Sequence, residues 1–179
     1  MSEIKKTIVS YTFVIAGLKL GLRYSRAKQK SLFLNKNEHQ EIKTLVNHLA
    51  PNCKSNQKVK NVLSSESKGV YQGKIYVKDI AQKTDAYQLS RALLLGENSE
   101  FNSKPELEIY ADDVKCSHGS SSGNIDHDSL YYLMTRGLSQ NDSKKLLIKG
   151  FLNDVVEFIK NPLIKKFIEN KLDKQINAH

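Results

Sequence analysis

The sequence predicts a mostly β protein that ends in a helical region. Two observations predict it: apolar residues alternate with polar ones in short runs between Leu18 and Cys116, and the apolar spacing becomes helical after Gly119. The intervals between the alternating runs are rich in Gly, Asn, Ser and Asp, which favour turns. No long helical pattern separates the runs, which argues against a doubly wound sheet. Periodicity alone leaves a sandwich, a barrel and a solenoid open.

The alternating runs mark the expected strands in chain order. They are 18–22, 32–34, 75–77, 93–95, 107–109 and 114–116. Turns are expected at 35–37, 64–69 and 96–99. Gly69 and Gly73 suit tight corners that need positive φ, although ordinary hairpin turns would use them equally well.

Three helices are expected after the strands. The run 120–123 predicts a flexible connector, after which Asp126 caps a first helix that ends at Gly137. Ser139 opens a second helix, and Asn161 with Pro162 separates it from a third. Their apolar faces must be buried, either against the β core or against another protein.

Composition indicates a soluble, cytoplasmic protein. The chain has 179 residues, 39% of them hydrophobic, which is enough for one substantial domain. Two cysteines are too few for a disulfide framework, and no secretory signal pattern is present. The apolar run 8–18 is too short to span a bilayer, so we expect no membrane association.

The net charge of +9 raises the question of nucleic acid. The excess lies in the first third of the chain, around Lys28, Lys30, Lys54, Lys58 and Lys60. No interleaved aromatic residues or recognition-helix pattern accompany it. A solvated basic face is the simpler interpretation, and we expect no nucleic-acid partner.

Cys116 and His118 are the candidate metal-ligating residues. Because they lie two positions apart on an expected strand, their side chains share one face. A thiol and an imidazole suit soft or borderline metals, but two ligands cannot complete a four-ligand site. Cys116 could instead be a core residue and His118 a solvated one. Of the remaining candidates, Asp112 and Asp113 are expected at a corner. His48 is expected to have its hydrogen bonds satisfied by a turn near Pro51, and Cys53 is expected to be structural.

Several segments, in the same order along the chain, resemble the SufB/SufD family of iron-sulfur cluster assembly proteins. They are 48–51 (HLAP), 55–57 (SNQ), 69–75 (GVYQGKI), 82–86 (QKTDA), 93–95 (LLL), 104–119 (KPELEIYADDVKCSHG) and 131–137 (YYLMTRG). The CSHG ending is similar to the SufD branch. The resemblance covers roughly residues 38–156, so chance similarity at one motif does not explain it.

The resemblance implies a β-helix over residues 1–122, followed by a helical region over 123–179. It implies a non-catalytic scaffold subunit that pairs with a SufB-like protein through its β-helix. It also implies that the helical region docks a SufC-like ATPase. His118 would face the SufB-like partner, with Cys116 on the same strand, and share a nascent iron-sulfur cluster or its iron. The residues expected to dock the ATPase are Tyr131, Leu133, Arg136, Leu146, Leu147 and Phe151.

Three alternatives remain open at this point. An enzyme using Asp112, Asp113 and His118 would need a substrate cleft, and the common hydrolase, metalloprotease and P-loop motifs are absent from the sequence. A nucleic-acid-binding protein would use the basic residues described above. A structural solenoid could instead self-associate, with a homodimer as its simplest form.

The start of the chain also differs from the family pattern, because it falls partway through the family's β-helix. Either the chain is a fragment or split-gene product, or residues 1–24 cover the exposed first coil. Uncapped solenoids are unstable, so we expect weak stability or self-association in isolation.

Overall fold

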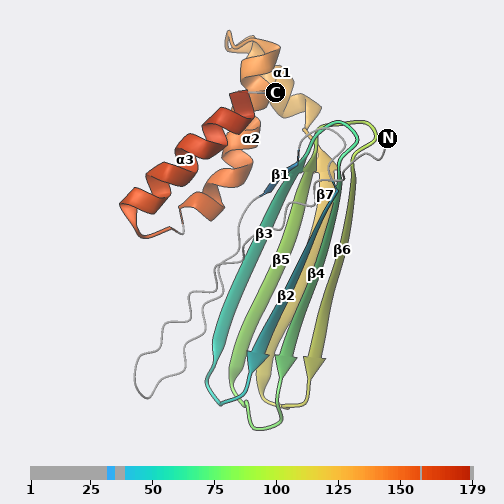
Figure 1. Cartoon of the computed structure of the whole chain (residues 1–179), viewed down its shortest axis with the longest axis vertical. Coiled ribbons are helices and arrows are strands. Elements are labelled where there is room, and N and C mark those ends of the chain that lie inside the picture. Colours follow the sequence, from blue (N-terminus) through green and yellow to red (C-terminus); the bar gives the residue numbers. More distant parts are fainter. Residues whose placement is uncertain (1–31, 35–38, 158, 178–179) are drawn as a thin grey trace, which may run out of the picture.

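Two parallel β-sheets lie face to face, with three helices beside one end of them (Figure 1). The structure is a computed structural model that describes residues 32–34, 39–157 and 159–177. The expected run 18–22, the proposed N-terminal cover, Lys28 and Lys30 lie outside the described residues.

The chain alternates between the sheets, one strand in each per coil. The strands are β1 (Leu32–Leu34), β2 (His39–His48), β3 (Lys54–Leu63), β4 (Lys68–Val77), β5 (Thr84–Leu94), β6 (Glu100–Ile109) and β7 (Val114–Asn124). One sheet has the order β1-β3-β5-β7 and the other β2-β4-β6, with every pair parallel. Each coil therefore stacks on the previous one, as the expected β-helix requires, and the mostly β fold with C-terminal helices is confirmed.

Residues at equivalent positions of successive coils pair with one another in register. Gln57 pairs with Gln88, and Gln88 pairs in turn with His118. The turns stack as well: the Asn52 amide donates to the Gln82 carbonyl at 2.8 Å, and the Lys83 amide to the Asp113 carbonyl at 2.6 Å. Backbone hydrogen bonds thus continue from strand to turn, so little of the coil backbone between neighbouring coils is left unpaired.

Two expectations about the strands are wrong. Residues 120–123 form no connector, because β7 continues through them to Asn124 and pairs with β5. Gly69 and Gly73 lie inside β4 and not at corners. The positive φ values fall instead on Asn52, Ser65 and Lys83, all of which are turn residues.

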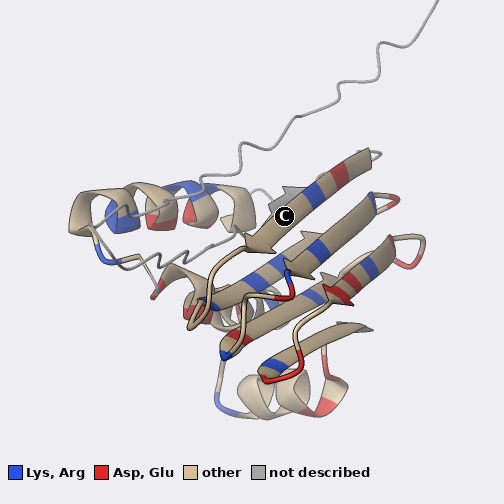
Figure 2. Cartoon of the chain, turned by 90° about the horizontal axis from the view of Figure 1, so that it is seen from below, with Lys and Arg blue, Asp and Glu red and all other residues tan. Residues whose placement is uncertain are grey.

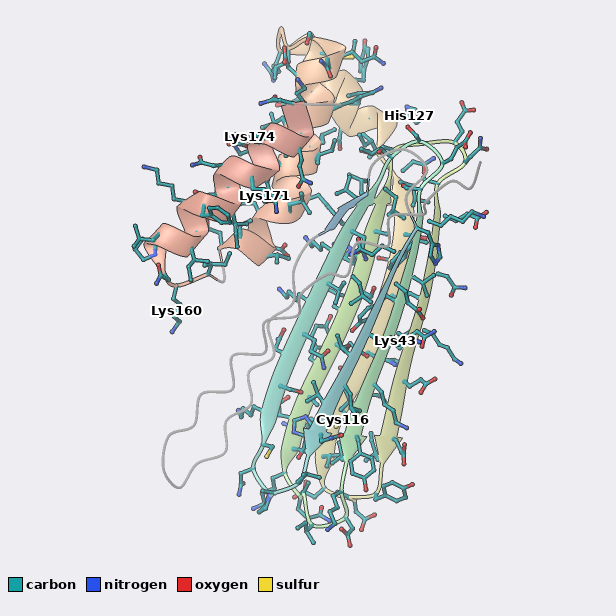
Figure 3. The ribbon with its side chains drawn as sticks, in the orientation of Figure 1. Lys43, Cys116, His127, Lys160, Lys171 and Lys174 are labelled. Atoms are coloured by element: carbon teal, nitrogen blue, oxygen red, sulfur yellow. The ribbon has the colours of Figure 1, made fainter. Side chains whose placement is uncertain are left out.

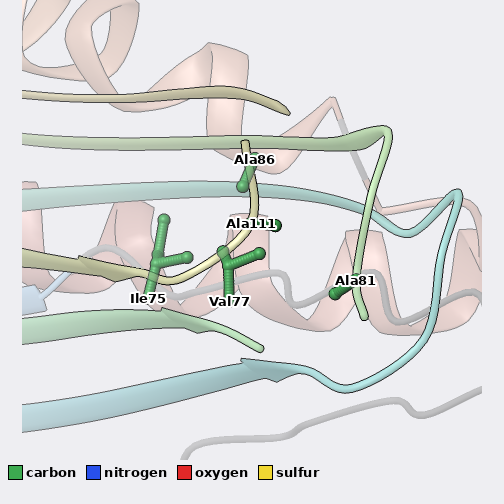
Figure 4. Close-up of a cluster of buried hydrophobic side chains, with 5 residues drawn as sticks. All are labelled: Ile75, Val77, Ala81, Ala86 and Ala111. Atoms are coloured by element: carbon green, nitrogen blue, oxygen red, sulfur yellow. The ribbon is translucent and has the colours of Figure 1, made fainter. Parts of the chain in front are cut away.

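The space between the sheets is filled by alternate side chains of each strand. In β4 the residues at odd positions are buried and those at even positions are partly exposed. Near the turns that follow β4 and β6, Ile75, Val77, Ala81, Ala86 and Ala111 form an apolar cluster (Figure 4). The small alanines let the turns approach the strand ends closely, which closes this end of the core.

The helices are α1 (His127–Thr135), α2 (Gln140–Val156) and α3 (Pro162–Asn177). Their starts follow the expected caps: the Asp126 carboxylate accepts from the Ser129 amide, and the Ser139 hydroxyl accepts from the Asp142 amide. Asn161 caps α3 by accepting from Leu163. Gly137, with φ of 94°, follows the end of α1 as expected.

Part of α2 packs on the outward face of β3. Val62 of β3 forms one buried cluster with Ile148, Leu152 and Ile176. Beside it Lys60, 5% exposed, makes an ion pair of 2.6 Å with Asp154. Burial against the chain's own sheet therefore accounts for one face of α2 and leaves other helical faces open.

Charged residues of both signs are interspersed over the described strands and helices (Figure 2). Lys54 pairs with Asp85, and both Lys58 and Lys60 approach Asp154. These lysines of the expected basic group are thus engaged within the fold. None of the helices in the described part of the chain combines the length and apolar character that crossing a bilayer requires.

Candidate functional site

The last coil leaves one side of the stack open. β6 and β7 are the final strands of their sheets, and no described strand pairs with their outer sides. We call these two outer sides the open edge. Such an edge presents a row of unpaired backbone N–H and C=O groups, which is a template for pairing with another chain.

Cys116 and His118 lie on β7 at this open edge. Cys116 pairs in register with Ala86 and His118 with Gln88, both of which are buried between the sheets. The shared face predicted from the sequence therefore looks toward the space between the sheets. His118 is exposed because no further coil covers it, whereas Cys116 is partly buried against the apolar cluster.

Burial raises the pKa of the Cys116 thiol, and a hydrogen bond from the Ala86 backbone offsets only part of this effect. The neutral thiol is therefore the resting form at neutral pH. Binding a metal would require loss of this proton, which a nearby cation favours. Across the residues described by the structure, no three His, Cys, Asp or Glu side chains gather into a metal-binding group. Cys116 and His118 are therefore not joined by further such ligands from the described part of the chain.

A buried polar layer lies directly behind His118. The Gln88 amide donates to the Tyr71 hydroxyl at 2.7 Å, and the Thr44 and Tyr71 hydroxyls are 3.0 Å apart. Gln57 accepts from Thr44 at 3.3 Å. Sequence reasoning missed this layer, because polar residues in a strand carry no sign of facing inward until the register is known.

The remaining polar candidates lie away from the open edge or at turns. His48 is fully buried and hydrogen-bonded to the Ser55 hydroxyl at 2.9 Å, and burial lowers its pKa. Cys53 is buried, in line with the structural role expected for it. Asp112 and Asp113 lie in the exposed turn between β6 and β7, as expected of corner residues.

A second candidate surface lies on α1 and α2. A shallow groove of about 480 Å³ is lined by Asp126, Asp128, Ser129, Tyr132, Leu133, Leu146 and Leu147. Three of the expected docking residues, Leu133, Leu146 and Leu147, thus come together. Tyr131 is 71% exposed nearby on α1, and the Arg136 guanidinium lies 5.2 Å from the Tyr132 ring centre.

Phe151 is placed differently from the other expected docking residues. Its ring packs toward the sheet beside the buried cluster, with the Lys60 ammonium 4.5 Å from the ring centre. The carbonyl of Phe151 also accepts a hydrogen bond from Lys60. Phe151 therefore anchors α2 to β3.

The open edge near Cys116 and the helical groove are far apart. Figure 3 shows Cys116 near the turn end of the sheets, while His127, at the start of α1, lies at the opposite end.

Comparison with known proteins places the chain in a family. Residues 19–151 match the family model described as SUF system FeS cluster assembly, SufBD core domain. The chain is 32% identical to the iron-sulfur cluster assembly protein SufD of Escherichia coli, over 95% of this chain and 42% of that protein. It is 40% identical to a SufBD family protein of Synechocystis, over 64% of this chain and 25% of that protein. It is 32% identical to SufD of Bacillus subtilis, over 64% of this chain and 26% of that protein.

The chain thus spans less than half the length of these curated relatives. The matched residues include all seven described strands, the open edge and α1. On this basis the chain belongs to the SufB/SufD family of iron-sulfur cluster assembly proteins.

Proposed function

We propose that this chain is a non-catalytic scaffold subunit for iron-sulfur cluster assembly. It pairs with a SufB-like protein through the open edge and docks a SufC-like ATPase through the groove on α1 and α2. The observation that carries the proposal is the position of Cys116 and His118 on β7, at the end of the stack where both sheets present a long terminal strand to another chain.

Pairing at the open edge follows from strand chemistry. β6 and β7 are 10 and 11 residues long, so their outer sides offer two long rows of backbone acceptors and donors, although Pro105 of β6 has no N–H to donate. A partner with its own pair of terminal strands would continue both sheets and cover His118. The chain's own β-helix supplies a rigid support for that pairing, since every strand behind the edge is already hydrogen-bonded.

The nascent cluster, or its iron, is the cargo of this interface. Thiolate sulfur and imidazole nitrogen are both ligands that iron accepts, and Cys116 and His118 provide one of each on the same face. The remaining ligands come from the partner, because the described residues around the edge offer no further group of ligands. The cargo is therefore held only in the assembled pair, with none bound tightly by this chain alone.

Docking of the ATPase is supported by the apolar character of the groove on α1 and α2. Leu146 is 48% exposed and Tyr131 71% exposed on adjoining helices, more apolar surface than a solvated pair of helices needs. Arg136, stacked against Tyr132, adds a fixed positive charge at the rim. Hydrolysis of ATP would then be supplied by the docked partner. This arrangement suits a cytoplasmic complex.

Co-purification of a tagged chain with co-expressed SufB-like and SufC-like proteins tests this function. Leu133→Asp and Leu146→Asp should each lose the ATPase and retain the SufB-like protein. Leu163→Asp is the matched control, because Leu163 is 79% exposed on α3 and outside the groove. Point variants are preferable to removal of the helices, which would expose Val62 and Lys60.

Two results would overturn the proposal. If the ATPase remains bound to both groove variants, or is lost equally from Leu163→Asp, the groove is not the docking surface. If the tagged chain recovers only copies of itself and no SufB-like protein, the open edge closes by self-association and the scaffold role fails.

A further inference from the structure

The polar layer between the sheets continues through all three described coils to His118. Gln57, Gln88 and His118 occupy the same register position on β3, β5 and β7. In the first coil Thr44 bonds to Gln57 across the sheets, and in the second Tyr71 bonds to Gln88. The third coil ends this series with His118 at the open edge.

Gln88 has one polar atom that nothing in its own layer satisfies. Its amide nitrogen serves two acceptors, the Tyr71 hydroxyl at 2.7 Å and the Gln57 carbonyl oxygen at 3.5 Å. Its own carbonyl oxygen, Oε1, is buried without a partner, and the side chain is fully buried. A buried acceptor left unpaired costs free energy, so this atom favours a donor that can come within reach.

His118, the register neighbour of Gln88 on β7, carries a ring that can turn to donate to this atom, which has no partner among the described residues. Gln57, the neighbour on β3, directs its carbonyl oxygen toward Gln88 and so does not donate to it. Neighbouring strands lie about 4.8 Å apart, and paired residues direct their side chains to the same face. A neutral imidazole carries one N–H and one lone pair, on different nitrogens. An N–H donated to Gln88 Oε1 leaves the lone pair of the other nitrogen free.

We propose that Gln88 is a positioning residue for His118: its Oε1 accepts a hydrogen bond from one ring nitrogen and thereby fixes the tautomer and orientation of the imidazole. The consequence for metal binding rests on the proposed function. In the assembled pair, the second ring nitrogen then points toward the partner with its lone pair free to bind the metal. A hydrogen bond on the other ring nitrogen orients metal-binding histidines in this way. The Tyr71 hydroxyl and Gln57 hold the Gln88 amide in place, so the orientation of His118 is set from within the β-helix.

Nitrogen-15 NMR of the histidine rings in the full chain tests the positioning directly, with His118 assigned by comparison with His118→Ala. At a pH where the ring is neutral, wild-type His118 should show one dominant tautomer. Gln88→Met removes the acceptor with little change of shape and should reduce the ratio of the two tautomers by about fivefold, the effect of one ordinary hydrogen bond.

Ser90→Ala is the matched control. Ser90 is the next inward residue of β5 after Gln88 and pairs in register with Val59 and Ser120, outside this polar layer, and its hydroxyl is also buried without a partner. A wild-type ring that averages between tautomers like a solvated imidazole would overturn the proposal without any variant. So would an unchanged ratio in Gln88→Met, or an equal change in Ser90→Ala.

This readout is separate from the proposed function. If the tautomer responds to Gln88 and yet no SufB-like protein binds, the positioning stands and the shared-ligand role falls. If the SufB-like protein binds and the tautomer ratio is unchanged in Gln88→Met, the positioning role falls and the proposed function stands.

Discussion

Replacing Gly73 by alanine should destabilise the protein strongly, because the interior of the β-helix has no room for a methyl group at this position. A Cβ at Gly73 would lie 2.0 Å from Gln88 Nε2 and 2.4 Å from the Tyr71 hydroxyl. Both side chains are fully buried, so neither can swing into solvent. The methyl group must therefore break the Tyr71–Gln88 hydrogen bond, and it also disturbs the bond between Tyr71 and Thr44.

The magnitude follows from these contacts. Two buried hydrogen bonds contribute about 1 kcal/mol each, and overpacking of a filled interior costs about 1–3 kcal/mol. Alanine recovers about 0.5–1 kcal/mol over glycine in a strand. The free energy of unfolding should therefore fall by about 2–4 kcal/mol, a large part of the ~5–15 kcal/mol of a typical domain.

Urea unfolding followed by circular dichroism provides the assay, with the midpoint shifted and the slope retained. Gly123→Ala is the matched control, because a Cβ there meets no atom within 4 Å. Because only the strand preference of alanine acts there, Gly123→Ala should leave the free energy of unfolding unchanged or raise it by up to about 1 kcal/mol. The reasoning is refuted if Gly73→Ala is as stable as wild type, or if both variants lose the same amount.

Three further predictions concern the helices and a buried histidine. Gly150→Ala, in α2 with open space around the added methyl, should raise the free energy of unfolding by about 0.5–1 kcal/mol in the same urea assay; a loss of stability would show that the site is crowded. Lys60→Met keeps the apolar stem of the side chain but removes its ion pair and its hydrogen bond to α2. Amide hydrogen exchange should therefore accelerate in α2 and stay unchanged in β5. Equal acceleration in both would contradict the role of Lys60 as a local anchor of α2. Burial lowers the pKa of His48, so the unfolded chain takes up a proton below its ordinary pKa of about 6.5 while the folded chain does not. The free energy of unfolding should therefore be highest above that pH and decline as the pH falls toward the lowered pKa. Urea midpoints of His48→Gln, measured between pH 5 and 8, should lack this decline. An equal decline in the variant would show that other groups cause it.

The sequence predicts the helices of this protein better than its strands, because helix signals are local. Asp126, Ser139 and Asn161 cap their helices through bonds that span only two or three residues. The strands β2 and β3 were not anticipated, since their inward positions include polar residues such as Thr44 and Gln57. The serines before Gly123 indicated a connector, but backbone pairing with β5 holds them in β7 regardless of side-chain type.

In the candidate site, too, local features could be predicted from the sequence and long-range ones could not. The shared face of Cys116 and His118 could be predicted because a strand alternates its side chains within three residues. The partnership of His118 with Gln88 could not, because it depends on a register between strands about 30 residues apart. Phe151 shows a related limit: helical periodicity identified it as apolar surface, but only the packed structure shows that it faces Lys60 and the sheet.

Hydrogen exchange of the open edge tests the central claim most directly. Mass spectrometry of the full chain, with and without a SufB-like partner, reports amide protection in each strand. The account predicts new protection in 100–109 and 114–124 on binding, with no change in β4 and β5, which are already paired on both sides. Binding of the partner with unchanged exchange in β6 and β7 would contradict it.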